Sequence, residues 1–117
     1  MLNYFQKAPI SVTICDSEGN ILEMNDKSIS TFSTDGKTLI GKSLLECHPE
    51  PARTKLLNML KNHNVNVYSI EKNGIKKLIY QMPWYHEDGN FGGYIELSME
   101  IPFELPHYVR RPKSNNL

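Results

Sequence analysis

The chain opens with two short runs of alternating apolar and polar residues, separated by a glycine turn. Residues 10–16 alternate with a period of two and are rich in β-branched side chains, which predicts a half-buried strand. Residues 17–20 contain Gly19, a residue that readily adopts the positive φ of hairpin turns. Residues 21–25 predict a second strand, so we expect a β-hairpin at the start of the domain.

The middle of the chain has the pattern of short helices. Asn25 or Asp26 is a suitable N-cap for a helix over residues 27–33. A longer helix is predicted over residues 52–62, because Pro51 costs no hydrogen bond in a first helical turn. The apolar side of this longer helix is expected to consist of Leu56, Leu57, Met59 and Leu60.

Three further strands are predicted in the second half, over residues 65–71, 77–85 and 92–100. The first two are joined by Asn73-Gly74, a strong hairpin signal. Pro83 predicts an edge position or a bulge. The element order is two strands, a helical middle and three strands, which predicts an α+β fold with a five-stranded antiparallel sheet and short helices packed on one face.

The two ends differ from the centre in pattern. Residues 1–9 predict an N-terminal flanking helix with the apolar residues Leu2, Tyr4 and Phe5, and residues 10–100 form the predicted domain. Residues 101–117 predict a partly disordered tail, in which two prolines block a helix leading to an output domain. Met1 and this irregular tail favour a complete small protein, although a fragment of a longer one stays open.

Three segments resemble a PAS domain. Residues 8–25 resemble the first hairpin of that family, with an Asp-x-x-Gly-x-Ile pattern and an Asn after the second strand. Residues 39–44 (Leu-Ile-Gly-Lys-Ser-Leu) resemble the stretch before the family's long helix, and residues 88–96 resemble its last hairpin. The resemblance implies a sensory or protein-interaction module, often dimeric, with a cavity between the helices and the sheet. That cavity holds haem, flavin, a small metabolite or nothing in different members.

Composition excludes several function classes. Lys+Arg and Asp+Glu both number 13, so the formal net charge is zero and no basic stripe indicates nucleic-acid binding. No apolar run is long enough for a membrane span, and no signal peptide is evident. Two cysteines, Cys15 and Cys47, are too few for a secreted disulfide framework. We therefore expect a cytoplasmic protein, and the resemblance implies a bacterial signalling role with a homodimer and a signalling partner.

The predicted ligand cavity is lined by inward side chains of the sheet and helices. An apolar lining with methionine and aromatic residues suits a small molecule, and suits a packed core equally well. The candidate lining residues are Ile14, Met24, Phe32, Leu57, Met59, Leu60, Tyr80, Met82, Trp84 and Leu97.

Cofactor and catalytic chemistry have weaker support in the sequence. Haem binding stays open with His48 or His63 as ligand, since haem-binding relatives use a His on or near the long helix. Flavin photochemistry is disfavoured, because Cys47 lacks the surrounding motif of light-sensing relatives. We predict no metal site and no catalytic residues, because no motif of a hydrolase, phosphate-binding loop or zinc protease is present. The rival hypotheses are a haem sensor, a ligand-free dimerisation module and a small enzyme.

Overall fold

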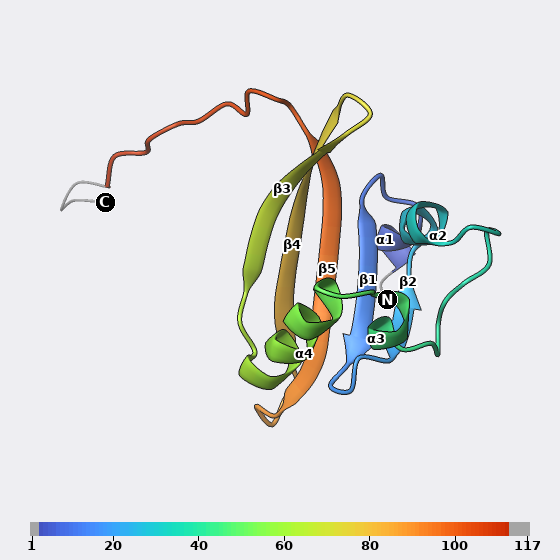
Figure 1. Cartoon of the computed structure of the whole chain (residues 1–117). Coiled ribbons are helices and arrows are strands. Elements are labelled where there is room, and N and C mark those ends of the chain that lie inside the picture. Colours follow the sequence, from blue (N-terminus) through green and yellow to red (C-terminus); the bar gives the residue numbers. More distant parts are fainter. Residues whose placement is uncertain (1–2, 113–117) are drawn as a thin grey trace.

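The structure, a computed structural model, describes residues 3–112 of the chain. Within this range five strands form one antiparallel sheet in the order β2-β1-β5-β4-β3 (Figure 1). The α+β fold and the five-stranded antiparallel sheet predicted from the element order are confirmed. The elements are α1 (Asn3–Gln6), β1 (Ser11–Asp16), β2 (Ile21–Met24), α2 (Asp26–Phe32), α3 (Leu44–Cys47), α4 (Ala52–Asn62), β3 (Asn66–Lys72), β4 (Ile75–Tyr85) and β5 (Phe91–Ile101).

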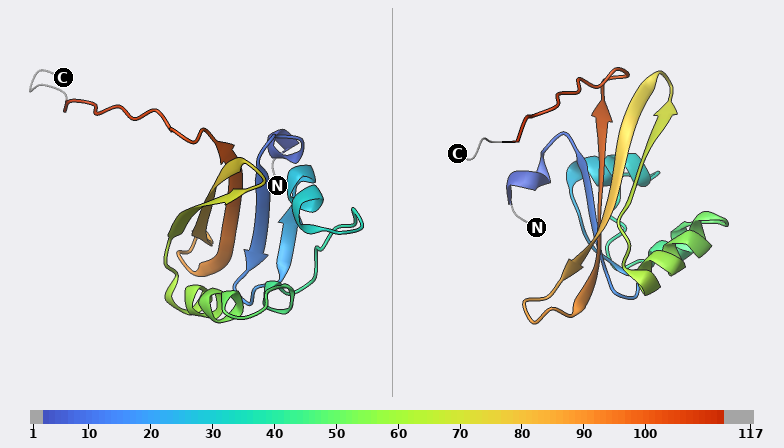
Figure 2. Two further views of the ribbon diagram at one scale, coloured as in Figure 1. Left: turned by 45° about the horizontal axis from the view of Figure 1, so that its top comes forward. Right: turned by 90° about the vertical axis from the view of Figure 1, so that its left-hand side faces the viewer.

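Three of the helices share one face of the sheet. Helices α2, α3 and α4 cover what we call the inner face, whereas α1 lies on the opposite side of the sheet from α2 and α4 (Figure 2). The prediction of short helices packed on one face is confirmed by α2, α3 and α4, while α1 falls within the segment predicted as an N-terminal flanking helix. Leu2, predicted to be part of the flanking helix, lies outside the described residues.

The first hairpin is held by the side chain of Asp16. Its Oδ1 accepts hydrogen bonds from the backbone N–H groups of Glu18 at 3.0 Å and Asn20 at 2.9 Å. Gly19 adopts a φ of 87°, in the left-handed region that glycine enters without a Cβ clash. Its carbonyl oxygen accepts a 2.8 Å hydrogen bond from the N–H of Leu44, so the turn also anchors the start of α3.

Asn25 connects three elements from a fully buried position. Its Oδ1 accepts hydrogen bonds from the N–H of Val12 in β1 at 2.9 Å and of Ser28 in α2 at 3.0 Å. Its Nδ2 donates to the carbonyl oxygens of Phe5 in α1 at 2.8 Å and Ile10 at 2.7 Å. Both donor hydrogens and the acceptor oxygen are used, so burial of this amide leaves no unsatisfied polar group.

Pro83 is accommodated because its strand is unpaired on one side at that point. The pairing of β3 with β4 begins at Asn66 and Gln81, so β4 has no partner on that side at Pro83. The register with β5 also shifts between Trp84 and Tyr85. Although β4 is an inner strand of the sheet, Pro83 thus lies at a position that is unpaired on one side and next to an irregularity, as expected for a residue that cannot donate to a sheet ladder.

The chain leaves the sheet after β5 and extends away from the domain (Figure 1). Phe103, Leu105, Tyr108 and Val109 are exposed along this segment. Residues 113–117, predicted to be disordered, lie outside the described residues, and the domain division at residues 9 and 100 stays a prediction. Among residues 3–112, no helix is both long and apolar enough to cross a membrane.

Candidate functional site

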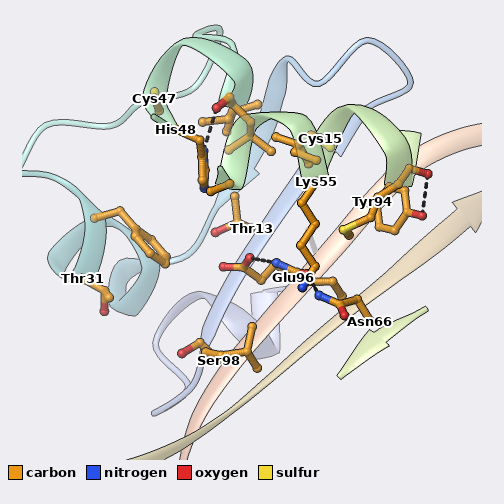
Figure 3. A pocket seen from close by; sticks show the side chains of 18 of the residues that line it. Thr13, Cys15, Thr31, Cys47, His48, Lys55, Asn66, Tyr94, Glu96 and Ser98 are labelled. Atoms are coloured by element: carbon orange, nitrogen blue, oxygen red, sulfur yellow. Dashed lines mark hydrogen bonds between the residues drawn. The ribbon is translucent and has the colours of Figure 1, made fainter. Parts of the chain in front are cut away.

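A cavity of about 490 Å³ lies between the inner face of the sheet and helices α2, α3 and α4 (Figure 3). Its size is within the range of pockets that bind small organic molecules. The helices and β2 supply mostly apolar walls, while the central strands supply a floor. The apolar lining consists of Ile21, Met24, Phe32, Leu39, Leu44, Ala52, Leu56, Met59, Ile70 and Ile79.

The floor of the cavity carries a row of polar side chains across four strands. Thr13, Glu96, Gln81 and Asn66 stand opposite one another on β1, β5, β4 and β3, so their side chains share the inner face. Asn66 Nδ2 donates to Gln81 Oε1 at 2.7 Å, and Gln81 Nε2 donates to Glu96 Oε2 at 2.7 Å. The hydrogen-bond chain therefore runs in one direction and ends on a carboxylate.

Glu96 has no cationic partner within the part of the chain that the structure describes. The ion pair found there, Lys7 to Asp26 at 3.2 Å, lies on the surface between α1 and α2. The Glu96 side chain is half-buried, and its hydrogen-bond donor is the neutral amide of Gln81. The floor thus presents a negative charge that no described side chain neutralises by direct contact.

Three lysines stand at the margin of the cavity. Lys55 reaches from α4 towards the sheet (Figure 3), and its Nζ lies 5.4 Å from the centroid of the Tyr68 ring. Lys72 and Lys77 line the end of the cavity formed by β3 and β4. Lys55 and Lys72 are exposed and Lys77 is half-buried, so water solvates the first two ammonium groups.

One end of the cavity is closed by Tyr94. Its hydroxyl lies 2.8 Å from the carbonyl oxygen of Met59 and 2.7 Å from that of Asn64, which fixes the end of α4 to β5. Cys15, Met59 and Tyr94 form a buried cluster there. Burial raises the pKa of both the Cys15 thiol and the Tyr94 hydroxyl, so both groups are neutral at pH 7.

The two candidate haem ligands occupy different environments. His48 lines the cavity, and its Nδ1 lies 2.7 Å from the carbonyl oxygen of Leu44. His63 ends α4 in the left-handed conformation with a φ of 59°, and its ring stacks on Phe91 at a centroid distance of 3.7 Å. His48 lines the cavity and His63 does not, and the choice of a haem ligand stays a prediction.

The predicted lining is corrected at several positions. Of the ten candidates, Met24, Phe32 and Met59 line the cavity. Leu57 is 46% exposed on α4, and Leu60 packs against the buried cluster rather than the cavity. The remaining five lie on the outer face of the sheet, at Ile14, Tyr80, Met82, Trp84 and Leu97.

The error at these five positions has a physical cause. Leu78, Tyr80, Met82 and Trp84 form the more apolar side of β4, and an apolar side is normally expected to face the core. The cross-strand pairs Tyr80 with Leu97 and Gln81 with Glu96 place that apolar side outward and the polar side inward. Ile14 and Trp84 line a smaller depression of about 320 Å³ on the outer face.

Sequence reasoning missed the polar row on the floor. Its signal is present in the sequence as the second side of each alternating strand, at Gln81 in β4 and Glu96 in β5. Thr13 in β1 and Asn66 at the start of β3 lie on the same face of the sheet. Only the strand register shows that these four residues form one row, because alternation within a strand does not indicate which residues face one another.

The comparisons with known proteins rest on structure alone. No family model matches the sequence, and no curated protein matches it. Among solved structures, a sensory box sensor histidine kinase from Vibrio cholerae has a TM-score of 0.64 at 19% identity, covering 85% of this chain and 86% of the other. The PAS domain of BvgS from Bordetella pertussis has a TM-score of 0.64 at 20% identity, covering 85% and 82%. A C-terminal domain from Streptococcus mutans has a TM-score of 0.66 at 16% identity, covering 83% and 79%.

These likenesses agree with the geometry described above. The five-stranded antiparallel sheet with helices over one face was predicted from the element order, and the cavity between them is the feature that the PAS resemblance implied. The structural matches extend over most of the sheet and helices, with PAS domains named among them. The chain therefore has the fold of a PAS domain.

Proposed function

We propose that this chain is a sensory module of a signalling system, in which a small molecule in the inner cavity changes a surface that contacts another protein. The observation that carries the proposal is the cavity of about 490 Å³ in a chain with the PAS fold. One of the similar structures is described as a sensory box sensor histidine kinase and another as the PAS domain of a histidine kinase, which supports a signalling role. A ligand acts by favouring one of two conformations of the protein.

A route from the cavity to the surface runs through α2. Thr31 and Phe32 of this helix line the cavity, and its first residue, Asp26, accepts hydrogen bonds from Gln6 at 2.7 Å and Lys7 at 3.2 Å. Asn25 joins the same helix start to the carbonyl oxygen of Phe5. A shift of α2 on ligand binding would therefore move α1.

We further propose that the chain forms a homodimer through the outer face of the sheet together with α1. The outer side of β4 is more apolar than the side that faces the cavity, and Tyr4 and Phe5 of α1 are 90% and 40% exposed. An apolar surface of this kind is normally covered by a partner. Light scattering after size-exclusion chromatography should give twice the monomer mass. Leu97→Lys should lower the measured mass towards that of the monomer, while Thr34→Lys in a surface loop should leave it unchanged. Retention of the dimer by Leu97→Lys would exclude this face.

The first test of the sensory proposal is native mass spectrometry of freshly purified protein, with an absorption spectrum from about 300 to 600 nm. A bound mass that is retained in gentle conditions and lost on unfolding is the expected result. A protein without bound mass, which also fails to bind small molecules added to it, would contradict a sensing cavity. The chain would then be a ligand-free interaction module.

Haem binding is a second candidate, and one contact favours it. Hydrogen bonding of His48 Nδ1 to the Leu44 carbonyl oxygen leaves Nε2 with the lone pair needed to bind iron. The polar row and the charge of Glu96 are less suited to haem, because the haem macrocycle requires an apolar surface on the floor of the cavity. His48 would hold the iron, and bound haem would supply redox or gas-binding chemistry. A strong absorption band that disappears in His48→Ala would establish this alternative.

We also propose that the module acts without catalysis, in the cytoplasm of a bacterium. The Nδ1 atom of His48 is bonded to a backbone carbonyl and is not available to activate the neighbouring Cys47 thiol. An activity that requires Cys47 would contradict this part of the proposal.

A further inference from the structure

The carboxylate of Glu96 on the floor of the cavity has no cationic partner among the described residues. Glu96 Oε2 accepts one hydrogen bond, from Gln81, and no described donor is bonded to Oε1. The carboxylate stands among apolar walls that include Met24 and Leu56. A half-buried carboxylate without a cationic partner is less stable than one in water, so a ligand that supplies a positive charge relieves that cost.

We propose that the cavity selects small molecules with a protonated amine at one end and an apolar body at the other. This inference rests on the proposed sensory function and names its ligand class. The ammonium group donates a charge-assisted hydrogen bond to Glu96 Oε1, which is about twice as strong as a bond between neutral groups. The apolar body lies against the walls formed by α2, α3 and α4.

The hydrogen-bond chain across the floor positions Glu96 for this role. Asn66 holds the carbonyl of Gln81, and this directs the Gln81 amide hydrogens towards Glu96. The carboxylate is thus fixed on its Oε2 side, while Oε1 remains for a ligand. A side chain ordered before binding loses little rotamer freedom when the ligand arrives.

The lysines at the margin do not reverse this preference. The ammonium of Lys55 lies over the Tyr68 ring, an interaction that already favours the cation. Lys72 is exposed, and Lys77 stands opposite Glu100 across the β4–β5 pair. The basic side chains of the described cavity lining are these three lysines and His48. Each of them has solvent or a protein group beside it.

The test compares three probes with the same six-carbon chain and different heads: n-hexylammonium, n-hexanol and n-hexanoate at neutral pH. Binding to the full chain is followed by titration in two-dimensional amide NMR spectra. We expect n-hexylammonium to bind at least about tenfold more tightly than n-hexanol, and n-hexanoate to bind most weakly. The amide signals that move should belong to Gln81, Glu96 and the residues of α2 and α4.

Two variants with opposite expected effects make the test specific to charge. Glu96→Gln retains the shape of the side chain and removes its charge. The affinity for n-hexylammonium should therefore fall to that for n-hexanol, while the affinity for n-hexanol should not change. Lys55→Gln removes a cation at the margin and should strengthen n-hexylammonium binding severalfold. Glu71→Gln is the matched control, because Glu71 is an exposed residue of β3 that does not line the cavity and stands opposite Lys76, which does not line it either.

The outcomes separate this inference from the proposed function. If n-hexanoate binds most tightly, or if all three probes bind equally, the amine preference is wrong and a ligand-binding cavity is retained. If no probe binds to the folded protein, both the amine preference and the sensing cavity are contradicted. If Glu96→Gln binds n-hexylammonium as the unaltered chain does, Glu96 is not the recognition group.

Discussion

Gly93 of β5 lies against the backbone of Cys15 in β1 so closely that a Cβ atom at Gly93 would overlap the carbonyl oxygen of Cys15. Gly93 also has a φ of 149°, which side-chain-bearing residues rarely adopt. The same carbonyl oxygen accepts a 2.9 Å hydrogen bond from Trp84 Nε1. A residue with a side chain therefore cannot occupy this position while β1 and β5 keep their observed register.

Substitution of Gly93 by alanine should destabilise the fold severely. The added Cβ meets backbone atoms of β1 that cannot move independently of the sheet, so we expect a loss of about 3 kcal/mol or more in the free energy of unfolding. Gly89→Ala is the matched control, since Gly89 has a φ of 90° in an open turn and should lose only about 1–2 kcal/mol. Urea unfolding measures both, and equal losses would show that the close approach to Cys15 is not important.

Replacement of Asn25 should release α1 from the domain. Asn25→Ala removes four hydrogen bonds from a buried site and should cost about 2–4 kcal/mol. Asn25→Asp retains the acceptor oxygen for Val12 and Ser28 but places a carboxylate beside the carbonyl oxygens of Phe5 and Ile10. Hydrogen exchange should therefore show faster exchange over residues 3–10 in both variants. Unchanged exchange there in Asn25→Asp would mean that α1 is held by other contacts.

The stability of the fold should decrease in alkaline solution. Burial raises the pKa of the Cys15 thiol above its ordinary value of 9.0 and that of the Tyr94 hydroxyl above its ordinary value of 10.0. Below pH 9 both groups are protonated in the folded and the unfolded chain. Above it the unfolded chain releases the thiol proton first, which favours unfolding as the pH rises.

Urea unfolding at pH values from about 7 to 10.5 measures this effect, because this range spans the ordinary pKa values of cysteine and tyrosine. The midpoint should be constant near neutrality and should fall above about pH 9. Cys15→Ala should have a lower midpoint throughout, because it removes buried volume, but a shallower fall between pH 9 and 10. The same slope in both proteins would show that the thiol does not contribute to the decrease.

Filling the cavity should weaken ligand binding and leave the fold intact. Ala52 lines the cavity at the exposed first turn of α4, so a larger side chain there can enter the space without displacing the buried cluster. Ala52→Trp should reduce the affinity for n-hexanol at least about tenfold, which is more than about 1.4 kcal/mol. Arg53→Trp adds the same group one position along the helix, outside the lining, and should bind normally. Equal binding by both variants would place the ligand elsewhere.

Local signals in the sequence determined most of the secondary structure. The predicted helix over residues 52–62 coincides with α4, and Asn25 and Ser43 cap α2 and α3 through their side chains. Gly19 and Asn73-Gly74 form turns with positive φ, as their residue types predict. Such features depend on a few neighbouring residues, because a cap or a tight turn is stabilised by backbone groups within the same segment.

The direction in which each strand faces was decided only by the tertiary structure. Alternation identified two sides of β4, Tyr80 and Met82 on one and Ile79 and Gln81 on the other, and the more apolar side was expected inward. In the structure, pairing with β5 places the polar side towards the helices instead. A period of two defines two faces without indicating which one is covered. That choice depends on register and packing between distant segments, and it is what places Glu96 in the cavity.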